Sequence, residues 1–238
     1  MAISPWQYKD LNDGNPENTW VAYSDTLFAQ RLHDLATSDF QPDIVELLTW
    51  NDFPESHYLR DLPSEDESAS DYMTWADGMY NYVAGQTHAP WRIIAKYYIH
   101  WWRNGSPPGI VMDQVIYWYR LHPKDAECSG GTSVPVRNNQ YPVDAVFAWA
   151  LVKDAATITM NVGDNENYQF TADGSGPVMN MVPFPENFSA NFTPSVSIAR
   201  NGETIVKSTG SMPISQECFW QNFNPVVNLA GDGINVGP

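Results

Sequence analysis

Two carboxylates stand three residues apart near position 50 of this sequence. Asp52 and Glu55 come just after a mostly apolar run at residues 43–50, and His57 and Tyr58 follow them. The length and apolar content of that run predict a short buried strand of a parallel sheet. Functional sites in parallel α/β folds lie at the carboxyl ends of the strands, so this pair is placed to donate and accept protons.

Cleavage of a glycosidic bond is a reaction that needs two carboxyl groups with different roles. One carboxylic acid protonates the leaving oxygen, while the other carboxylate activates a water molecule or attacks the sugar. A spacing of three residues on a turning loop allows either separation of the two groups, so it leaves the stereochemical outcome open. The alternative interpretation is structural: Asp52 would cap a turn and Glu55 would be a solvated surface side chain.

The overall charge limits the class of partner. The chain of 238 residues carries a formal net charge of −16, and most of its 28 acidic residues lie in the first 127 residues. Such a field repels phosphate backbones, so we expect no nucleic acid partner, whereas a neutral polysaccharide is compatible with it. No run approaches the ~18 apolar residues of a membrane span, and we expect a monomer that does not enter a membrane. The start, Met1–Trp6, lacks the pattern of a signal peptide.

The first half of the chain alternates between strand and helix patterns. Apolar residues at helical spacing predict helices at about residues 24–36, 69–83 and 90–105. Apolar runs predict strands at residues 43–50 and 113–119. Such alternation is typical of α/β folds.

The rest of the chain shows short β signals without a helical period. The pair Asn201-Gly202 between residues 195–200 and 203–208 is a strong signal for a two-residue hairpin. We therefore predict an α/β part over residues 1–127, followed by an all-β part over residues 128–238 that forms a β-sandwich. The other β segments are expected at residues 143–152, 157–162, 167–171 and 178–184.

The segment Trp50-Asn51-Asp52-Phe53-Pro54-Glu55-Ser56-His57-Tyr58 resembles the signature of glycoside hydrolase family 71, the fungal α-1,3-glucanases or mutanases. Ser4–Trp6 resembles the end of an earlier barrel strand of that family. Pro90–Trp102 and Asp113–Pro123 resemble its last helix and last strand, and the β-rich tail resembles its appended sandwich. Glycoside hydrolase family 99 also spaces two acids by three residues, but its motif lacks the Ser-His-Tyr run.

The resemblance implies the C-terminal portion of a (β/α)8 TIM barrel, about three β/α units, followed by a β-sandwich. It implies hydrolysis of α-1,3-glucan with inversion at the anomeric carbon and places the catalytic acids on Asp52 and Glu55. We favour Glu55 as the acid and Asp52 as the base. Pro54 stands where many members carry Gly, which stiffens the turn without changing the spacing.

Two further expectations follow from the resemblance. A longer parent protein would be secreted or held in the cell wall, although this chain shows no signal peptide. The alternative to an active enzyme is a truncated, non-catalytic remnant that binds glucan.

Aromatic and polar side chains in the motif, near the N-terminus and after the strand at residues 113–119 are the candidates for sugar contacts. The aromatic rings either stack on sugar faces or pack in the core. The polar groups in the motif either bond to sugar hydroxyls or anchor the loop. The two basic residues after the strand either contact the substrate or, as we favour, form an ion pair with the long acidic loop expected at about residues 51–70. The candidates are Trp6, Tyr8, Trp50, Asn51, His57, Tyr58, Arg120 and His122.

The chain has two cysteines, Cys128 and Cys218. They form no CxxC or Cys/His pattern, so we expect no metal site, and no cofactor is expected. Two buried free thiols are one interpretation. In an exported protein the simplest outcome is one disulfide, and we predict that they pair and tie the start of the sandwich to its last strand.

Overall fold

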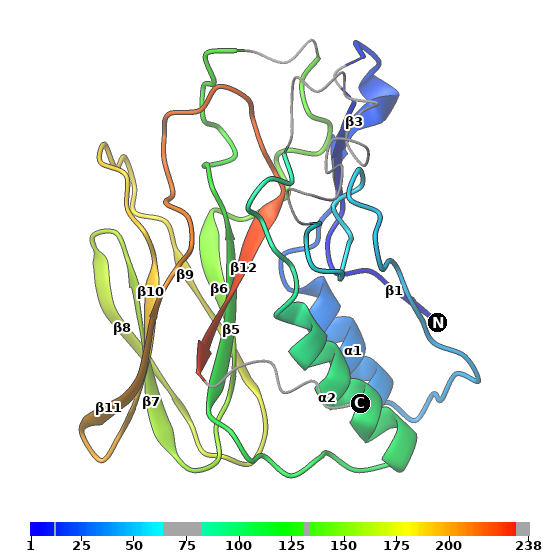
Figure 1. The fold of residues 1–238 in the computed structure, drawn as a ribbon, viewed down its shortest axis with the longest axis vertical. Coiled ribbons are helices and arrows are strands. Elements are labelled where there is room, and N and C mark those ends of the chain that lie inside the picture. Colours follow the sequence, from blue (N-terminus) through cyan, green and yellow to red (C-terminus); the bar gives the residue numbers. More distant parts are fainter. Residues whose placement is uncertain (12, 64–81, 131–133, 232–238) are drawn as a thin grey trace.

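The structure, a computed structural model, describes residues 1–11, 13–63, 82–130 and 134–231. Two four-stranded antiparallel sheets pack face to face (Figure 1). Two helices lie side by side against one of these sheets, on the face that points away from the other sheet. The elements are β1 (Ala2–Ile3), β2 (Tyr8–Asp10), the 3-10 helix η1 (Pro16–Asn18), β3 (Thr19–Val21), α1 (Leu27–Thr37), β4 (Glu46–Leu47), α2 (Trp91–Asn104), β5 (Gln114–Arg120), β6 (Ala145–Leu151), β7 (Ala156–Val162), β8 (Asn165–Ala172), β9 (Val178–Pro183), β10 (Ser195–Arg200), β11 (Glu203–Thr209) and β12 (Pro225–Gly231).

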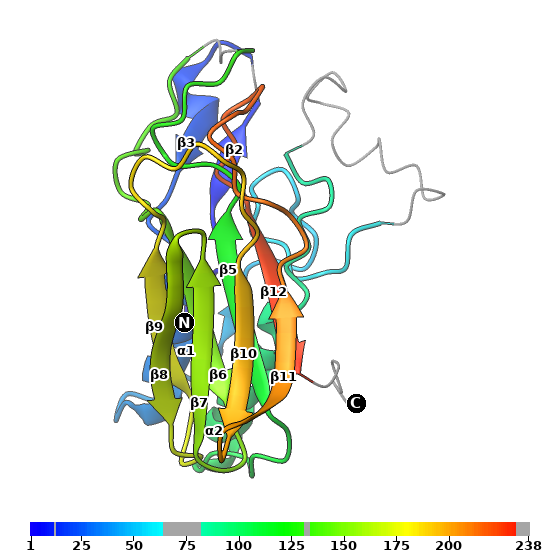
Figure 2. The ribbon, with the colours of Figure 1, turned by 90° about the vertical axis from the view of Figure 1, so that its left-hand side faces the viewer.

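The two large sheets form the β-sandwich that the second half of the sequence predicts. The inner sheet has the strand order β12-β5-β6-β9, and the outer sheet has the order β11-β10-β7-β8. Figure 2 looks onto the outer sheet. Strand β7 alternates buried and half-buried residues along its length, which is the pattern of a strand with one face in the core and one toward solvent.

The inner sheet differs because both of its faces are covered. Every residue of β5 and β6 is buried. Ile116 and Trp118 of β5 face the cluster that contains the helices, whereas Tyr117 and Tyr119 face the outer sheet. The molecule therefore has two apolar cores, one on each side of the inner sheet.

Helix α2 forms as its sequence pattern predicts. Ile94, Tyr97 and Tyr98 are on its buried face, and the rings of Tyr97 and Tyr98 lie 5.7 and 6.1 Å from the ring of Trp149 on β6. The helix ends at Gly105, whose φ of 70° is in the left-handed region that closes many helices. No helix in the described residues is both long and apolar enough to cross a membrane.

The hairpin signal is also confirmed. Asn201 and Gly202 have φ values of 54° and 81° and connect β10 to β11. Positive φ at both central residues is the requirement of a type I′ turn, and Asn and Gly meet it at low cost.

The strand at residues 113–119 does not have the expected neighbours. We expected the last strand of a parallel barrel, but β5 pairs antiparallel with β6 and with β12. A strand that is buried on both faces has a continuous apolar sequence in either kind of sheet. Here the helices of the first half cover one face, so the pattern predicted the burial correctly and the strand direction incorrectly. The inner sheet thus spans the predicted boundary between residues 127 and 128, and the division into two domains stays a prediction.

The strand expected at residues 43–50 is mostly a loop. Only β4 forms there, and it pairs in parallel with β1; Ile44 is 74% exposed, so the run is not the buried strand that we predicted. Among the described residues, β1 and β4 are the parallel pair, and a portion of a TIM barrel is not evident. The predicted helix at residues 69–83 lies outside the described residues, apart from Tyr82 and Val83 in a turn.

Asp113 ties the two sheets together at one end. Its carboxylate accepts hydrogen bonds from two nitrogens of Arg200, at 2.8 and 3.1 Å, and from the backbone N–H of Lys153 at 2.9 Å. The side chain is only 10% exposed. The guanidinium of Arg200 lowers the pKa of Asp113 below its usual range. Asp113 therefore has a structural role, since its carboxylate joins the start of β5 to the end of β10.

We predict that Asp113→Asn reduces the free energy of unfolding by about 1–3 kcal/mol at pH 7, because hydrogen bonds to a charged group are lost. A carboxyl whose pKa is lower in the folded protein stabilises it above the unfolded pKa of about 3.9, and this contribution disappears as the pH falls through the folded value. Urea unfolding from pH 7 down to pH 2 measures the difference. Asp61→Asn, in the exposed pair with Arg92, is the control and should cost less than about 1 kcal/mol. A difference between wild type and Asp113→Asn that persists at pH 2 would contradict this assignment.

Candidate active site

The segment from Thr49 to Arg60 folds back on itself into a short loop, the acid loop. Its two ends are joined by backbone hydrogen bonds, from Thr49 N to His57 O at 2.8 Å and from Arg60 N to Trp50 O at 2.8 Å. Within the loop, Asp52 N donates to Thr49 Oγ1 at 2.9 Å. These bonds make the loop compact, so its side chains have defined positions.

The loop brings both predicted catalytic carboxyls to the ring of His57. Nε2 of His57 lies 3.0 Å from Oδ2 of Asp52 and 3.7 Å from Oε2 of Glu55. The carboxyl side chains are 38% and 32% exposed, while the His57 side chain is 8% exposed. The imidazole is therefore buried, whereas the two carboxyls that it contacts are partly exposed.

Asp52 also has the structural role that was the alternative interpretation. Its Oδ1 accepts a hydrogen bond from the backbone N–H of Glu55 at 3.1 Å, which caps the turn between the two acids. The ring of His57 lowers the pKa of Asp52 below its usual range, against the opposing effect of burial. Asp52 is therefore ionised at neutral pH, and the cap leaves its other oxygen, Oδ2, toward His57.

Two residues of the N-terminal segment complete the surroundings of the pair. Lys9 Nζ of β2 lies 3.2 Å from Oε1 of Glu55, and Ser4 Oγ lies 3.4 Å from Nδ1 of His57. Neither residue was a candidate from the sequence alone. Lys9 stands in no motif, and only the resemblance of Ser4–Trp6 to a segment of family 71 pointed to this part of the chain.

Asp52, Glu55 and His57 are also the one group within the described residues whose donor atoms are close enough to hold a metal ion, within 4.8 Å of one another. Nitrogen and carboxylate ligands suit divalent cations such as zinc. In this structure, however, Lys9 already supplies a positive charge to Glu55.

A network of buried polar groups supports the loop on its buried side. Asn224 Nδ2 donates to the hydroxyl of Tyr58 at 3.0 Å, and that hydroxyl donates to the backbone carbonyl of Gln86. Asn222 Nδ2 donates to Oε1 of Gln86 at 2.7 Å. The hydroxyl of Tyr82 donates to the carbonyl of Pro54 inside the acid loop. Residues that lie more than 130 positions apart thus fix the position of the loop.

The other predicted sugar-binding residues fall into three groups. Trp6 and Tyr8 are buried, and their polar atoms donate to the backbone carbonyls of Phe223 at 3.0 Å and Gln221 at 2.9 Å. These two side chains are part of the core between the N-terminal segment and the end of the chain.

Trp50 and Asn51 are exposed next to the two acids, whereas Tyr58 is fully buried. The guanidinium carbon of Arg92 lies 6.0 Å from the centre of a Trp50 ring, and Arg92 also bonds to the carboxylate of Asp61 at 3.0 and 3.2 Å. Trp50 is therefore an accessible aromatic ring with a positive charge beside it.

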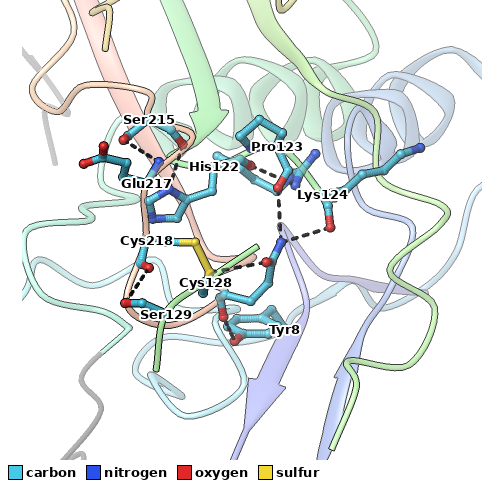
Figure 3. Close-up of a disulfide and its surroundings, with 11 residues drawn as sticks. Tyr8, His122, Pro123, Lys124, Cys128, Ser129, Ser215, Glu217 and Cys218 are labelled. Atoms are coloured by element: carbon cyan, nitrogen blue, oxygen red, sulfur yellow. Dashed lines mark hydrogen bonds between the residues drawn. A yellow bond between two sulfur atoms is a disulfide. The ribbon is translucent and has the colours of Figure 1, made fainter. Parts of the chain in front are cut away.

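Arg120 and His122 are in a different environment. Arg120 is buried and forms an ion pair with Asp144. Nδ1 of His122 lies 3.0 Å from the carbonyl of Ser215 (Figure 3). An ion pair of Arg120 was expected, but its partner is Asp144 after residue 127 rather than the acidic loop. Burial lowers the pKa of His122.

The predicted disulfide is present. Cys128 and Cys218 are bonded, with their Cα atoms 4.6 Å apart, and the bond lies beside His122 and Ser215 (Figure 3). Gln221, three residues after Cys218, donates to the carbonyls of Pro123 at 3.1 Å and Lys124 at 3.0 Å. The bond therefore holds the segment that enters the network under the acid loop.

We predict that replacing both cysteines by serine reduces the free energy of unfolding by about 3–4 kcal/mol, because the crosslink closes a loop of 90 residues in the unfolded chain. Urea unfolding of the oxidised wild type and of the double variant measures the loss. The reduced wild type is the control and should resemble the variant. A loss below about 1 kcal/mol would contradict the prediction.

The loop thus brings two carboxyls together, and cleavage of a glycosidic bond requires two such groups. The family model for glycosyl hydrolase family 71 matches residues 1–235, and the chain belongs to this family. A mutanase of Penicillium rubens is 28% identical over 98% of this chain and 49% of its own length. A glucan endo-1,3-alpha-glucosidase of Schizosaccharomyces pombe is 30% identical over 93% of this chain and 47% of its own length.

An ascus wall endo-1,3-alpha-glucanase of Schizosaccharomyces pombe is 26% identical over 67% of this chain and 36% of its own length. The chain thus spans about half the length of the first two relatives and about a third of the last. No solved structure matches it.

The network under the loop leads to a prediction about Asn224. We expect Asn224→Ala to reduce the free energy of unfolding by about 1–3 kcal/mol, because the substitution leaves the buried Tyr58 hydroxyl with one partner fewer. Backbone amides of residues 53–60 should also exchange with deuterium faster. Asn228→Ala is the matched control, since Asn228 is a buried asparagine of β12 whose Oδ1 bonds to Ser211 N at 2.9 Å. If both variants changed exchange in the loop equally, Asn224 would have no particular role there.

Proposed function

We propose that the loop at residues 49–60 carries the catalytic pair for hydrolysis of α-1,3-glucan. The observation that supports this most directly is the convergence of Asp52 and Glu55 on Nε2 of His57. The mutanase and α-1,3-glucan-hydrolysing names of the relatives support the substrate class. The net charge of −16 is compatible with a neutral polymer.

The surroundings of the two acids favour different roles. Asp52, whose pKa is lowered, is the base that takes a proton from the attacking water. Glu55 is the acid that protonates the leaving oxygen. Once Glu55 has given up its proton, the ammonium of Lys9, 3.2 Å away, stabilises the carboxylate that remains.

The distance between the acids bears on inversion. Inverting pairs are about 6.5–9.5 Å apart, which leaves room for a water molecule. The donor atoms of Asp52, Glu55 and His57 all lie within 4.8 Å of one another. Inversion therefore requires the two side chains to turn apart toward the exposed side, where the substrate binds. We assign the observed geometry to the enzyme between turnovers.

The substrate would approach from the side of Trp50. Trp50 is 59% exposed and lies at the start of the loop, three residues after the end of β4. Indole rings bind sugar faces by stacking, and Asn51 beside it offers an amide to hydroxyl groups. Trp6, Tyr8 and Tyr58 act by supporting the loop from the core.

We also propose the wider context of this site. The parallel pair β1-β4 and the helices α1 and α2 would be the share of residues 1–127 in a barrel of a longer protein, with residues 128–238 as its sandwich. The disulfide supports secretion or a place in the cell wall, since such bonds persist in oxidising surroundings.

The second candidate function is glucan binding without catalysis. It is favoured by the exposed indole ring of Trp50, which can stack on a sugar without any proton transfer by the acids. The exposed Trp50 would serve either function, so an experiment has to separate release of sugar from binding.

We predict that Asp52→Asn and Glu55→Gln each reduce the release of reducing ends from insoluble α-1,3-glucan by about 10²–10⁴-fold, the usual contribution of a general acid or base. Binding of the protein to the same glucan, measured by co-sedimentation, should stay within about twofold. Asp173→Asn, an exposed aspartate after β8, is the control and should keep full activity. Glucan binding without release of sugar by the wild type would instead favour the second function.

A further inference from the structure

His57 is the group that both acids share. Its Nε2 is buried and makes no hydrogen bond of regular geometry within the described residues. The atom lies 3.0 Å from Asp52 Oδ2 and 3.7 Å from Glu55 Oε2. On the opposite side of the ring, Nδ1 lies 3.4 Å from the hydroxyl of Ser4. One ring nitrogen thus lies between the two carboxyls, and the other has a neutral partner.

An acid and base pair that inverts has to be reset after every turnover. The base ends the reaction with the proton of the attacking water, and the acid ends it without its own proton. The next turnover requires that proton on the acid again. This requirement comes from the proton balance of the proposed reaction, so a role for His57 in the reset rests on the proposed function.

We propose that His57 returns the proton from Asp52 to Glu55 between turnovers. With Nδ1 protonated and donating toward Ser4 Oγ, the lone pair of Nε2 accepts the proton of Asp52 Oδ2. The ring is then an imidazolium between two carboxylates. Nε2 next releases the proton to Glu55 Oε2, and the ring is neutral again. One proton has moved from Asp52 to Glu55, and nothing else is gained or lost.

The surroundings of each group fit this sequence of steps. Glu55 waits as a carboxylate beside Lys9, 3.2 Å away, until the proton arrives. Asp52 keeps its Oδ1 on the Glu55 N–H at 3.1 Å, so Oδ2 remains directed to the ring. The distance of 3.7 Å from Nε2 to Glu55 shortens by rotation of a half-exposed side chain.

The buried position of the ring gives the route its advantage. The carboxyls are open to solvent on one side and meet His57 on the other. A glucan chain on the open side excludes water from the acids, while the route through His57 runs beneath the chain. The acids are therefore reset without release of a polymer that is still bound.

The test compares wild type with His57→Gln at saturating glucan oligosaccharide. Glutamine is a polar side chain of similar length, but its amide has no basic nitrogen that can take up a proton. We expect kcat to fall by about 10²-fold with KM within about threefold. In His57→Gly, which leaves space for a free ring, added imidazole at constant pH and ionic strength should restore the rate in proportion to its concentration, and it should leave wild type unchanged. A residue that only positions Asp52 gives no such restoration.

Ser4→Ala is the second variant, since it removes the partner of Nδ1 without changing the ring. We expect a severalfold lower kcat with KM unchanged. His100→Gln, at an exposed position of α2, is the matched control and should behave as wild type with and without imidazole. Thermal unfolding of each variant checks that it is folded.

The outcomes separate the two levels of the proposal. A normal kcat in His57→Gln, or a low kcat in His57→Gly that imidazole leaves unchanged, overturns the proton route alone. Wild type without activity, or full activity in Asp52→Asn and Glu55→Gln, overturns the proposed function and the proton route with it. If His57→Gln is unfolded, a normal kcat in Ser4→Ala overturns the route.

Discussion

A polar side chain that is closed off from water has to find its partners within the protein, and residues 221–225 supply them for the loop that carries the acids. The side chains of Asn222 and Asn224 donate to Gln86 and Tyr58. In the other direction, side chains of the first half donate to backbone carbonyls of the segment, as Trp6 does to Phe223. The arrangement around Asp52 and Glu55 depends on these reciprocal bonds.

The two apolar cores of the molecule explain why water does not reach these hydrogen bonds. The inner sheet is covered on one side by α1 and α2 and on the other by the outer sheet. Strand β12 enters this sheet directly after the polar segment and pairs with β5 along seven residues. The sandwich is therefore a structural part of the acid loop's surroundings, and a substitution in its last strand can alter the site without contact to a substrate.

The elements that depend only on neighbouring residues were the ones that the sequence predicted best. The hairpin at Asn201 and Gly202 depends on two neighbouring residues, and helix α2 depends on a periodicity within one segment. The direction of β5 was wrong because it depends on partners far along the chain. Lys9 and Ser4 were missed for the same reason, since only the folded chain brings them to Glu55 and His57.

The bond between Asn224 and Tyr58 also has a consequence for the order of events during synthesis. The acid loop leaves the ribosome before its partner, which follows 166 residues later. At about 5–20 residues per second, the loop is translated several seconds or more before the groups that fix it. The arrangement of the two acids is therefore complete only after residues 222–225 have been translated, and a nascent chain that stalls in the sandwich holds its acids on an unsupported loop.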